Sequence, residues 1–138
     1  MSELNRGDYR KPLPKPSPTS RPFWEAARRH ELRLQHCGAC NQYVYYPRDR
    51  CPYCMADKLE WRDVSGRGKV HSYTVVRRAS TRSFADGPYV LAIVELDEGP
   101  HMTTNVVAPP ENVKVGMPVT VYFDDVTPEH TLVKFKPA

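Results

Sequence analysis

The chain has 138 residues, 40% of them apolar, with 14 prolines and a formal net charge of +4, which suits one ordinary domain or two small modules on a shared core. Its apolar runs, such as residues 89–94, are far shorter than the roughly 20 residues that cross a membrane, and residues 1–8 lack the apolar core of a signal peptide. We therefore expect no membrane span and a cytoplasmic location, where paired cysteines are more often metal ligands than disulfides.

Charge is distributed unevenly along the chain. Residues 1–35 carry eight Lys or Arg against four Asp or Glu, and residues 63–94 carry five against two. Residues 95–138 reverse this, with three against seven. The basic part could face a phosphate-bearing ligand or an acidic protein surface. Ordinary solvated charge explains so modest an excess equally well.

Residues 1–20 are predicted to form a flexible, proline-rich tail. Prolines at alternate positions exclude a helix and a central strand, because proline lacks the backbone N–H and fixes φ. These residues are Pro12, Pro14, Pro16 and Pro18.

A short helix is predicted at about 21–31. Thr19 or Ser20 can cap its first turn, in which a proline is tolerated. Phe23 and Trp24 lie in this helix, and we interpret them as an anchor on the protein's own core rather than as a binding face.

From residue 32 the hydrophobic pattern becomes that of strands. Alternating and aromatic residues predict three short strands at 32–37, 43–46 and 59–62, which form a compact ribbon with the cysteines. From residue 64 the chain reads as all-β, with turn residues between five candidate strands at 69–77, 89–96, 102–107, 118–123 and 132–136.

The second part of the chain favours a small closed barrel. Five strands in about 75 residues suit the OB type, in which the first strand is long and bent. Gly66 and Gly68 lie at the start of that strand, where a barrel needs bending. A small β-sandwich or an SH3-like barrel would give a similar pattern.

Four cysteines predict a site for one structural zinc ion. They form two CxxC pairs with ten residues between them: Cys37, Cys40, Cys51 and Cys54. Each pair can present two thiolates from one tight turn, and four thiolates complete a tetrahedron with no open position for water. A ribbon of this size cannot be held by apolar burial, so metal binding would supply its folding energy.

Two other readings of the cysteines remain. Tetrahedral sulfur sites also take iron, as in rubredoxin electron carriers. Rubredoxin turns usually have glycine after the second cysteine, where this chain has Asn41 and Met55, which disfavours iron. Two disulfides are the other alternative, and the expected cytoplasmic location argues against them.

No active-site motif is found outside the cysteines. The sequence contains no GxSxG, HExxH, Walker or GxGxxG motif. We interpret Glu95 and its acidic neighbours as a solvated turn. His71 and His101 lie in or beside predicted strands without an evident carboxylate partner, and His36 is expected to have a surface or packing role. The chain does not read as a self-sufficient enzyme.

Several motifs in order resemble one known family. They are Phe23-Trp24, residues 34–40, Tyr46-Pro47, Cys51-Pro-Tyr-Cys54, Trp61, and residues 65–74, 88–99 and 115–119. Residues 21–136 thereby resemble the acyl-CoA-associated family with an N-terminal rubredoxin-like zinc ribbon and a C-terminal OB-fold, long catalogued as a domain of unknown function. The resemblance implies a mainly β protein with three parts: a tail at 1–20, a helix plus zinc ribbon at 21–62, and a five-stranded OB-fold barrel at 63–138.

The resemblance also implies a non-catalytic accessory protein. Family members are typically found beside thiolases, some bridge a thiolase to hydroxymethylglutaryl-CoA synthase, and others are fused or bound to acyl-CoA hydratases. Their contribution is to support a partner enzyme and help to hold acyl-CoA or its CoA moiety. The family has no motif that identifies CoA-contacting residues in this sequence. Arg77, Arg78 and Arg82 are therefore candidates by charge alone, and a role in keeping a loop soluble explains them equally well.

A single-stranded nucleic-acid-binding protein is the alternative function. Zinc ribbons and OB-folds both serve that role, and Tyr73, Phe84 and Tyr89 near the arginines could supply stacking platforms. The acidic C-terminal part and the modest net charge disfavour this alternative, as does the resemblance.

Overall fold

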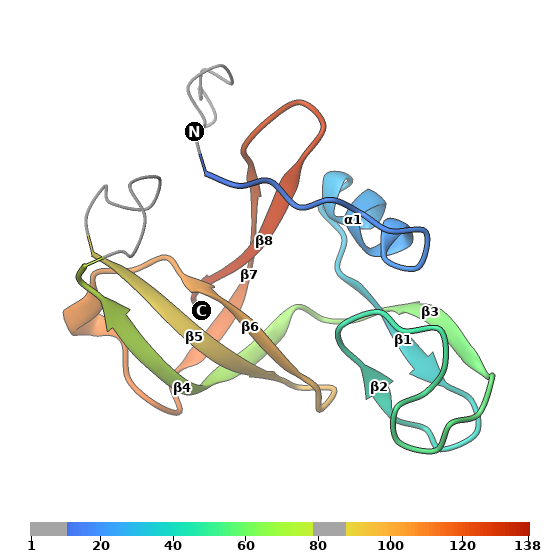
Figure 1. The fold of residues 1–138 in the computed structure, drawn as a ribbon. Coiled ribbons are helices and arrows are strands. Elements are labelled where there is room, and N and C mark those ends of the chain that lie inside the picture. The colour runs from blue at the N-terminus through green and yellow to red at the C-terminus, as the bar shows by residue number, and fades with distance from the viewer. Residues whose placement is uncertain (1–10, 79–87) are drawn as a thin grey trace.

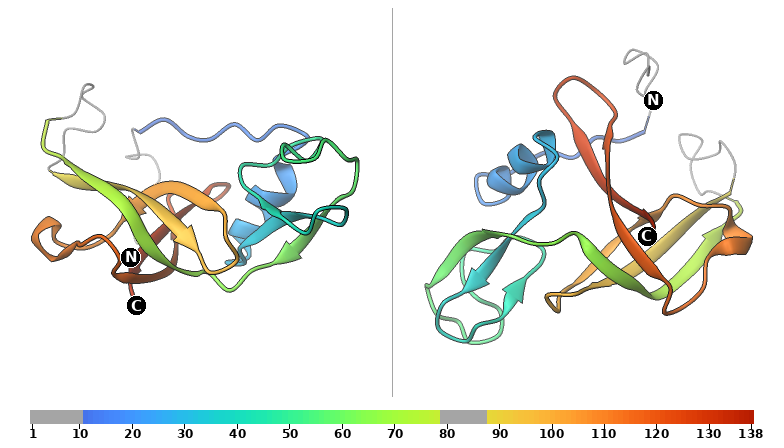
Figure 2. Two further views of the ribbon diagram at one scale, coloured as in Figure 1. Left: turned by 90° about the horizontal axis from the view of Figure 1, so that it is seen from below. Right: turned by 180° about the vertical axis from the view of Figure 1, so that it is seen from behind.

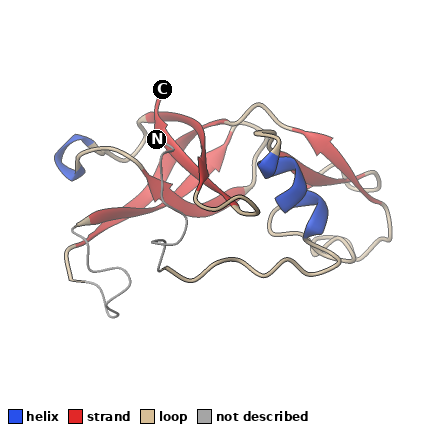
Figure 3. Cartoon of the chain, turned by 90° about the horizontal axis from the view of Figure 1, so that it is seen from above, coloured by secondary structure: helices blue, strands red, loops and turns tan. Residues whose placement is uncertain are grey.

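The structure is a computed structural model that describes residues 11–78 and 88–138 (Figure 1). In these ranges a short helix is followed by two groups of strands, and strands dominate the cartoon in Figure 3. The elements are α1 (Arg21–Arg28), β1 (Arg33–Cys37), β2 (Tyr43–Val44), β3 (Leu59–Asp63), β4 (Arg67–Val76), β5 (Tyr89–Leu96), β6 (His101–Val106), η3 (Pro110–Asn112), β7 (Pro118–Asp125) and β8 (Thr131–Pro137).

The first three strands form a small antiparallel sheet in the order β2-β1-β3. A buried glutamine ties this sheet to the loop that follows β2. The Gln35 side-chain amide donates to the carbonyl of Arg48 at 2.8 Å, and the Arg48 N–H donates to Gln35 Oε1 at 2.7 Å. Because both polar ends of the amide are satisfied, Gln35 can be buried at little cost while it fixes the loop.

The other five strands close into a barrel in the order β4-β5-β6-β8-β7. All pairs are antiparallel except β6 with β8, where Val106 lies beside Phe135. The connection between β6 and β7 holds the single turn η3. This is the partly parallel, five-stranded arrangement of an OB-fold, as the spacing of the strands predicted.

The barrel closes tightly at Gly68. A Cβ atom there would meet the backbone carbonyl of Glu95 on the paired strand at a distance that side chains essentially never show. Gly68 is therefore a packing requirement of the β4–β5 pair rather than a flexible hinge.

The helix α1 packs against both groups of strands. It lies between the ribbon and the β7–β8 hairpin, as Figure 2 shows from two sides. Phe23 and Leu34 belong to the same buried cluster as the barrel residues. On the hairpin side, the His30 ring stacks on Phe123 at 5.2 Å, and its Nε2 lies 2.9 Å from a carboxylate oxygen of Asp125. The interpretation of the Phe23–Trp24 pair as an anchor on the core is confirmed, because Phe23 is 2% exposed and Trp24 is half-buried against the same cluster.

The helix is shorter than predicted at its C-terminus. It ends at Arg28, and His30 adopts a left-handed backbone conformation (φ 62°) that no sequence signal announced. Ser20 occupies the N-cap position, but its hydroxyl caps no helical N–H and instead accepts from the N–H of Ser17 at 2.9 Å. Residues 1–10 of the predicted tail lie outside the described residues.

No helix in the described part of the chain is both long enough and apolar enough to span a membrane.

Candidate metal centre

The two CxxC turns have the same backbone geometry. In the first, the N–H of Asn41 donates to the carbonyl of Cys37 at 2.8 Å, and in the second the N–H of Met55 donates to the carbonyl of Cys51 at 2.8 Å. Asn41 and Met55 are both left-handed, with φ of 62° and 64°. The position that glycine usually occupies in such turns is thus held by Asn and Met in the same conformation. The absence of glycine is therefore weaker evidence against iron than the sequence alone indicated.

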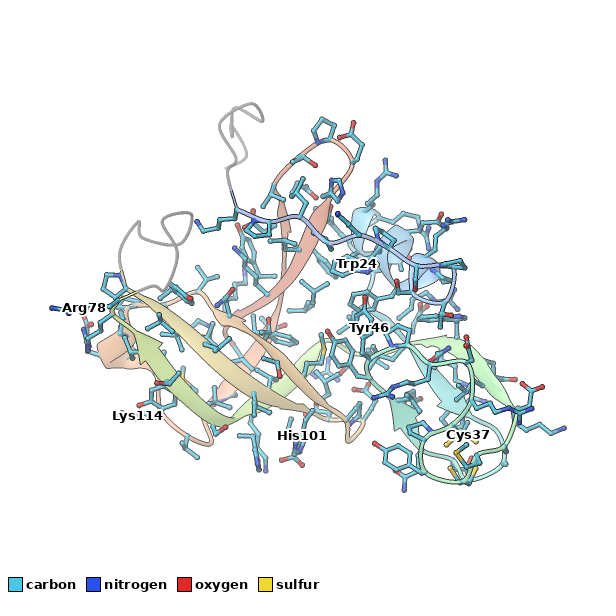
Figure 4. The ribbon with its side chains drawn as sticks, in the orientation of Figure 1. Trp24, Cys37, Tyr46, Arg78, His101 and Lys114 are labelled. Atoms are coloured by element: carbon cyan, nitrogen blue, oxygen red, sulfur yellow. The ribbon has the colours of Figure 1, made fainter. Side chains whose placement is uncertain are left out.

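The turns bring four sulfur atoms together at the end of the ribbon, where Figure 4 labels Cys37. All four lie within 4.8 Å of one another. Cys37 Sγ and Cys54 Sγ are 3.7 Å apart, and Cys40 Sγ and Cys51 Sγ are 3.6 Å apart. Four sulfurs bound to one ion at ~2.3 Å would stand ~3.8 Å apart in a tetrahedron. The donor set therefore fits a single four-coordinate metal ion.

Backbone N–H groups donate to two of the sulfurs. Ala39 N donates to Cys37 Sγ and Tyr53 N donates to Cys51 Sγ, both at 3.4 Å. In the metal-free protein the two thiols of the first CxxC pair differ in pKa. The N–H of Cys40 lowers the pKa of Cys37 to about 7, whereas burial raises the pKa of Cys40 to about 12. A metal ion must therefore displace protons from this cluster.

The arrangement supports a structural role for the ion. Four protein ligands fill a tetrahedron, so no position remains for a catalytic water. The sulfurs are free, with separations far above the ~2.05 Å of a disulfide bond. The two-disulfide reading is therefore not what the structure shows. His36, next to Cys37, is buried and packs edge-on against Tyr43 at 4.8 Å, which is the packing role expected for it.

The arginines proposed for CoA lie elsewhere. Arg77 and Arg78 are exposed directly after β4, at the end of the barrel where Figure 4 labels Arg78. Arg82 lies outside the described residues. The arginine candidates remain predictions from charge.

One cluster was missed from the sequence. His71, Glu95 and His101 place their ligand atoms within 4.8 Å of one another on β4, β5 and β6. The sequence analysis found no carboxylate partner for the two histidines; the structure places Glu95 near both rings, although no ion pair joins them in the described residues. The signal for two of the three residues was available, because Glu95 and His101 flank a short turn and face each other in the β5–β6 hairpin. The contribution of His71 depends on the register of β4, which contains a bulge at this point.

Comparison with known proteins is consistent with this architecture. Residues 24–60 match the family described as "ChsH2, rubredoxin-like zinc ribbon domain", and residues 61–124 match "ChsH2, C-terminal OB-fold domain". A solved structure described as "Ltp2-ChsH2(DUF35) aldolase" has a TM-score of 0.79 and 34% identity, over 90% of this chain and 98% of that one.

Two curated relatives differ in length. A "DUF35 domain-containing scaffold protein" of Methanothermobacter thermautotrophicus is 36% identical over 80% of this chain and 85% of its own length. A "Probable enoyl-CoA hydratase alpha subunit" of Thermomonospora curvata is 38% identical over 84% of this chain, which spans only 37% of that relative. The chain belongs to the ChsH2/DUF35 family of proteins, in which a rubredoxin-like zinc ribbon is followed by an OB-fold domain.

Proposed function

We propose that this protein is a non-catalytic accessory subunit that docks on an enzyme of acyl-CoA chemistry, a thiolase-like enzyme or an acyl-CoA hydratase, and helps to hold the CoA moiety. The observation that carries the proposal is the closed four-cysteine centre, which can stiffen a docking module but offers no coordination position for a substrate.

The names of related proteins support the accessory role. Relatives similar over most of their length are called scaffold proteins, and longer relatives that contain a similar segment are called alpha subunits of hydratases. A chain that occurs both alone and as part of an enzyme subunit is suited to hold another protein in place.

We propose zinc as the resident ion. Zinc has no redox chemistry and takes tetrahedral thiolate sites without preference from d electrons, which suits a purely structural centre. The ribbon then presents two exposed apolar side chains beside the metal, Tyr53 at 60% and Met55 at 65% exposure. Because exposed apolar side chains on a rigid support favour protein contacts, this tip of the ribbon is our candidate for a docking surface.

The CoA contact is assigned to the arginines that follow β4. Arg77 and Arg78 are exposed at the end of the barrel, and Arg82, which follows them in the sequence, lies outside the described residues. Arginine recognises phosphate oxygens through two parallel hydrogen bonds, which suits the phosphates of CoA. The proposal is that these residues contact the phosphates while the partner enzyme holds the acyl chain.

Co-expression with the enzyme encoded beside it tests the proposal. The two proteins should co-purify, and replacing Arg77, Arg78 and Arg82 with alanine should weaken acyl-CoA binding by the complex, more at low salt than at high salt. Lys134→Ala is a matched control, because Lys134 already pairs with Asp124 at 2.6 Å on the β7–β8 hairpin. An equal loss in the control would show that general charge, and not the arginine cluster, attracts CoA.

Single-stranded nucleic-acid binding is the alternative that the same assay decides. An OB barrel binds oligonucleotides with basic and aromatic side chains, and Tyr73 on β4 is 37% exposed. Tight oligonucleotide binding with a steep salt dependence, and no recovered partner enzyme, would replace the accessory function with this one.

A further inference from the structure

We propose that His71, Glu95 and His101 form a second, exchangeable site for a divalent transition-metal ion on the outer face of the barrel. These residues form a group separate from the four cysteines, and the inference does not depend on the accessory function. Figure 4 labels His101 on the outside of the barrel, at the end of the β5–β6 hairpin.

The three side chains come from three neighbouring strands and point to the same face. Glu95 lies directly opposite His101 in the β5–β6 pair. Val94 and Leu96, which flank Glu95, are buried, so Glu95 points outward. His101 is exposed and precedes the buried Met102.

A bulge in β4 brings the third ligand to the cluster. Val70 pairs with Val94 and Ser72 with the preceding residue of β5, so His71 is the extra residue between two successive pairs. An extra residue bends its strand and changes the direction of its side chain, and such bulges are common next to functional sites. His71 is exposed as a result.

The two rings lean toward each other over the middle strand. β4 and β6 each pair with β5 and not with each other, so their backbones are ~9–10 Å apart. The ring centroids of His71 and His101 are nevertheless only 4.5 Å apart. None of the three side chains forms a hydrogen bond or an ion pair with another described residue. Their ligand atoms are therefore not engaged by the part of the chain that the structure describes.

The donor set selects the class of ion. Two imidazole nitrogens with one carboxylate oxygen suit Zn²⁺, Ni²⁺ or Co²⁺, whereas Mg²⁺ and Ca²⁺ prefer oxygen ligands alone. Ligands ~2.0–2.2 Å from one ion stand ~3–3.5 Å apart, and the exposed rings can rotate to reach this from the 4.8 Å limit of the cluster. Three protein ligands leave positions open to water or to a donor from a bound molecule. This open coordination distinguishes the site from the closed cysteine centre.

Titration of Zn²⁺ and of Ni²⁺ into protein whose cysteine centre is already filled tests the proposal. We expect one further equivalent to bind, with no binding of Mg²⁺ at the same concentration. His71→Ala, Glu95→Gln and His101→Ala should each weaken this step by at least about tenfold, since even outer-shell partners of metal ligands are worth 10–100-fold. His130→Ala is the matched control, because His130 lies in the β7–β8 turn and bonds Thr127.

Paramagnetic Ni²⁺ gives a readout that does not depend on affinity. It should broaden the imidazole NMR signals of His71 and His101 and leave those of His30 and His130 sharp. Unchanged thermal midpoints and full occupancy of the cysteine centre would show that the variants are folded. Absence of a further equivalent at millimolar metal, or equal binding by His101→Ala and the wild type, would overturn the proposal and leave the cluster as two histidine rings in contact.

Discussion

Met55→Gly should tighten zinc binding by the ribbon. Met55 has φ of 64° and is 65% exposed, so the substitution relieves an unfavourable backbone conformation and removes little buried surface. The left-handed conformation costs a non-glycine residue about 1–2 kcal/mol. The larger conformational entropy that glycine loses on folding costs about 0.4–1 kcal/mol. The folding free energy of the ribbon should therefore become more favourable by about 0.5–1 kcal/mol.

This gain should be measurable as metal affinity. If the ribbon folds only when the ion binds, folding energy adds to binding energy, and the zinc dissociation constant should fall about two- to fivefold. Competition with a chelator of known affinity measures it. Asn41→Gly is the matched control, because asparagine tolerates the left-handed region and the gain there should be smaller. Unchanged or weaker zinc binding by Met55→Gly would refute the coupling of folding to metal.

Three further predictions follow from the metal centre and the barrel. Cys40→Ser should abolish stoichiometric zinc and remove the hydrogen-exchange protection of the ribbon, while the amides of β5 and β6 stay protected. Apparent zinc affinity should fall as pH falls, since the pKa of Cys40 at about 12 requires release of its proton on binding; the slope should steepen below pH about 7, where Cys37 also takes up a proton in the metal-free chain. Gly68→Ala should lower the free energy of unfolding by about 1–3 kcal/mol, as measured by urea denaturation, because its Cβ would meet the carbonyl of Glu95. In Gly99→Ala no atom lies within 4 Å of the new Cβ, so any loss there reports the positive φ alone.

Elements with strong local signals were predictable from the sequence. The CxxC spacing identified the four cysteines that the structure brings together, and alternation of apolar residues located the barrel strands to within a few residues. The helix boundary was missed because His30 takes the left-handed role that glycine usually signals. Ser20 is at the N-cap, as predicted, but its hydroxyl accepts from the N–H of Ser17 instead of from a helical N–H.

Features that depend on strand register were not predictable. The His71, Glu95 and His101 cluster joins three strands, and one bulge residue decides whether His71 reaches it. Periodicity places residues on a face but does not fix the offset between β4 and β5. The same limit applies to the arginines after β4. Their charge makes them candidates for a phosphate contact, but the sequence does not give their positions in space.

We propose above all that the chain supports an acyl-CoA enzyme without catalysing a reaction itself. The most direct test measures acyl-CoA turnover and acyl-CoA affinity in three samples: the proposed partner enzyme alone, this protein alone, and the two together. The account predicts no turnover by the chain alone, a stable complex, and a tighter acyl-CoA affinity or higher solubility of the enzyme in that complex. Turnover of acyl-CoA esters by the lone chain, or an enzyme that behaves identically without it, would contradict the account.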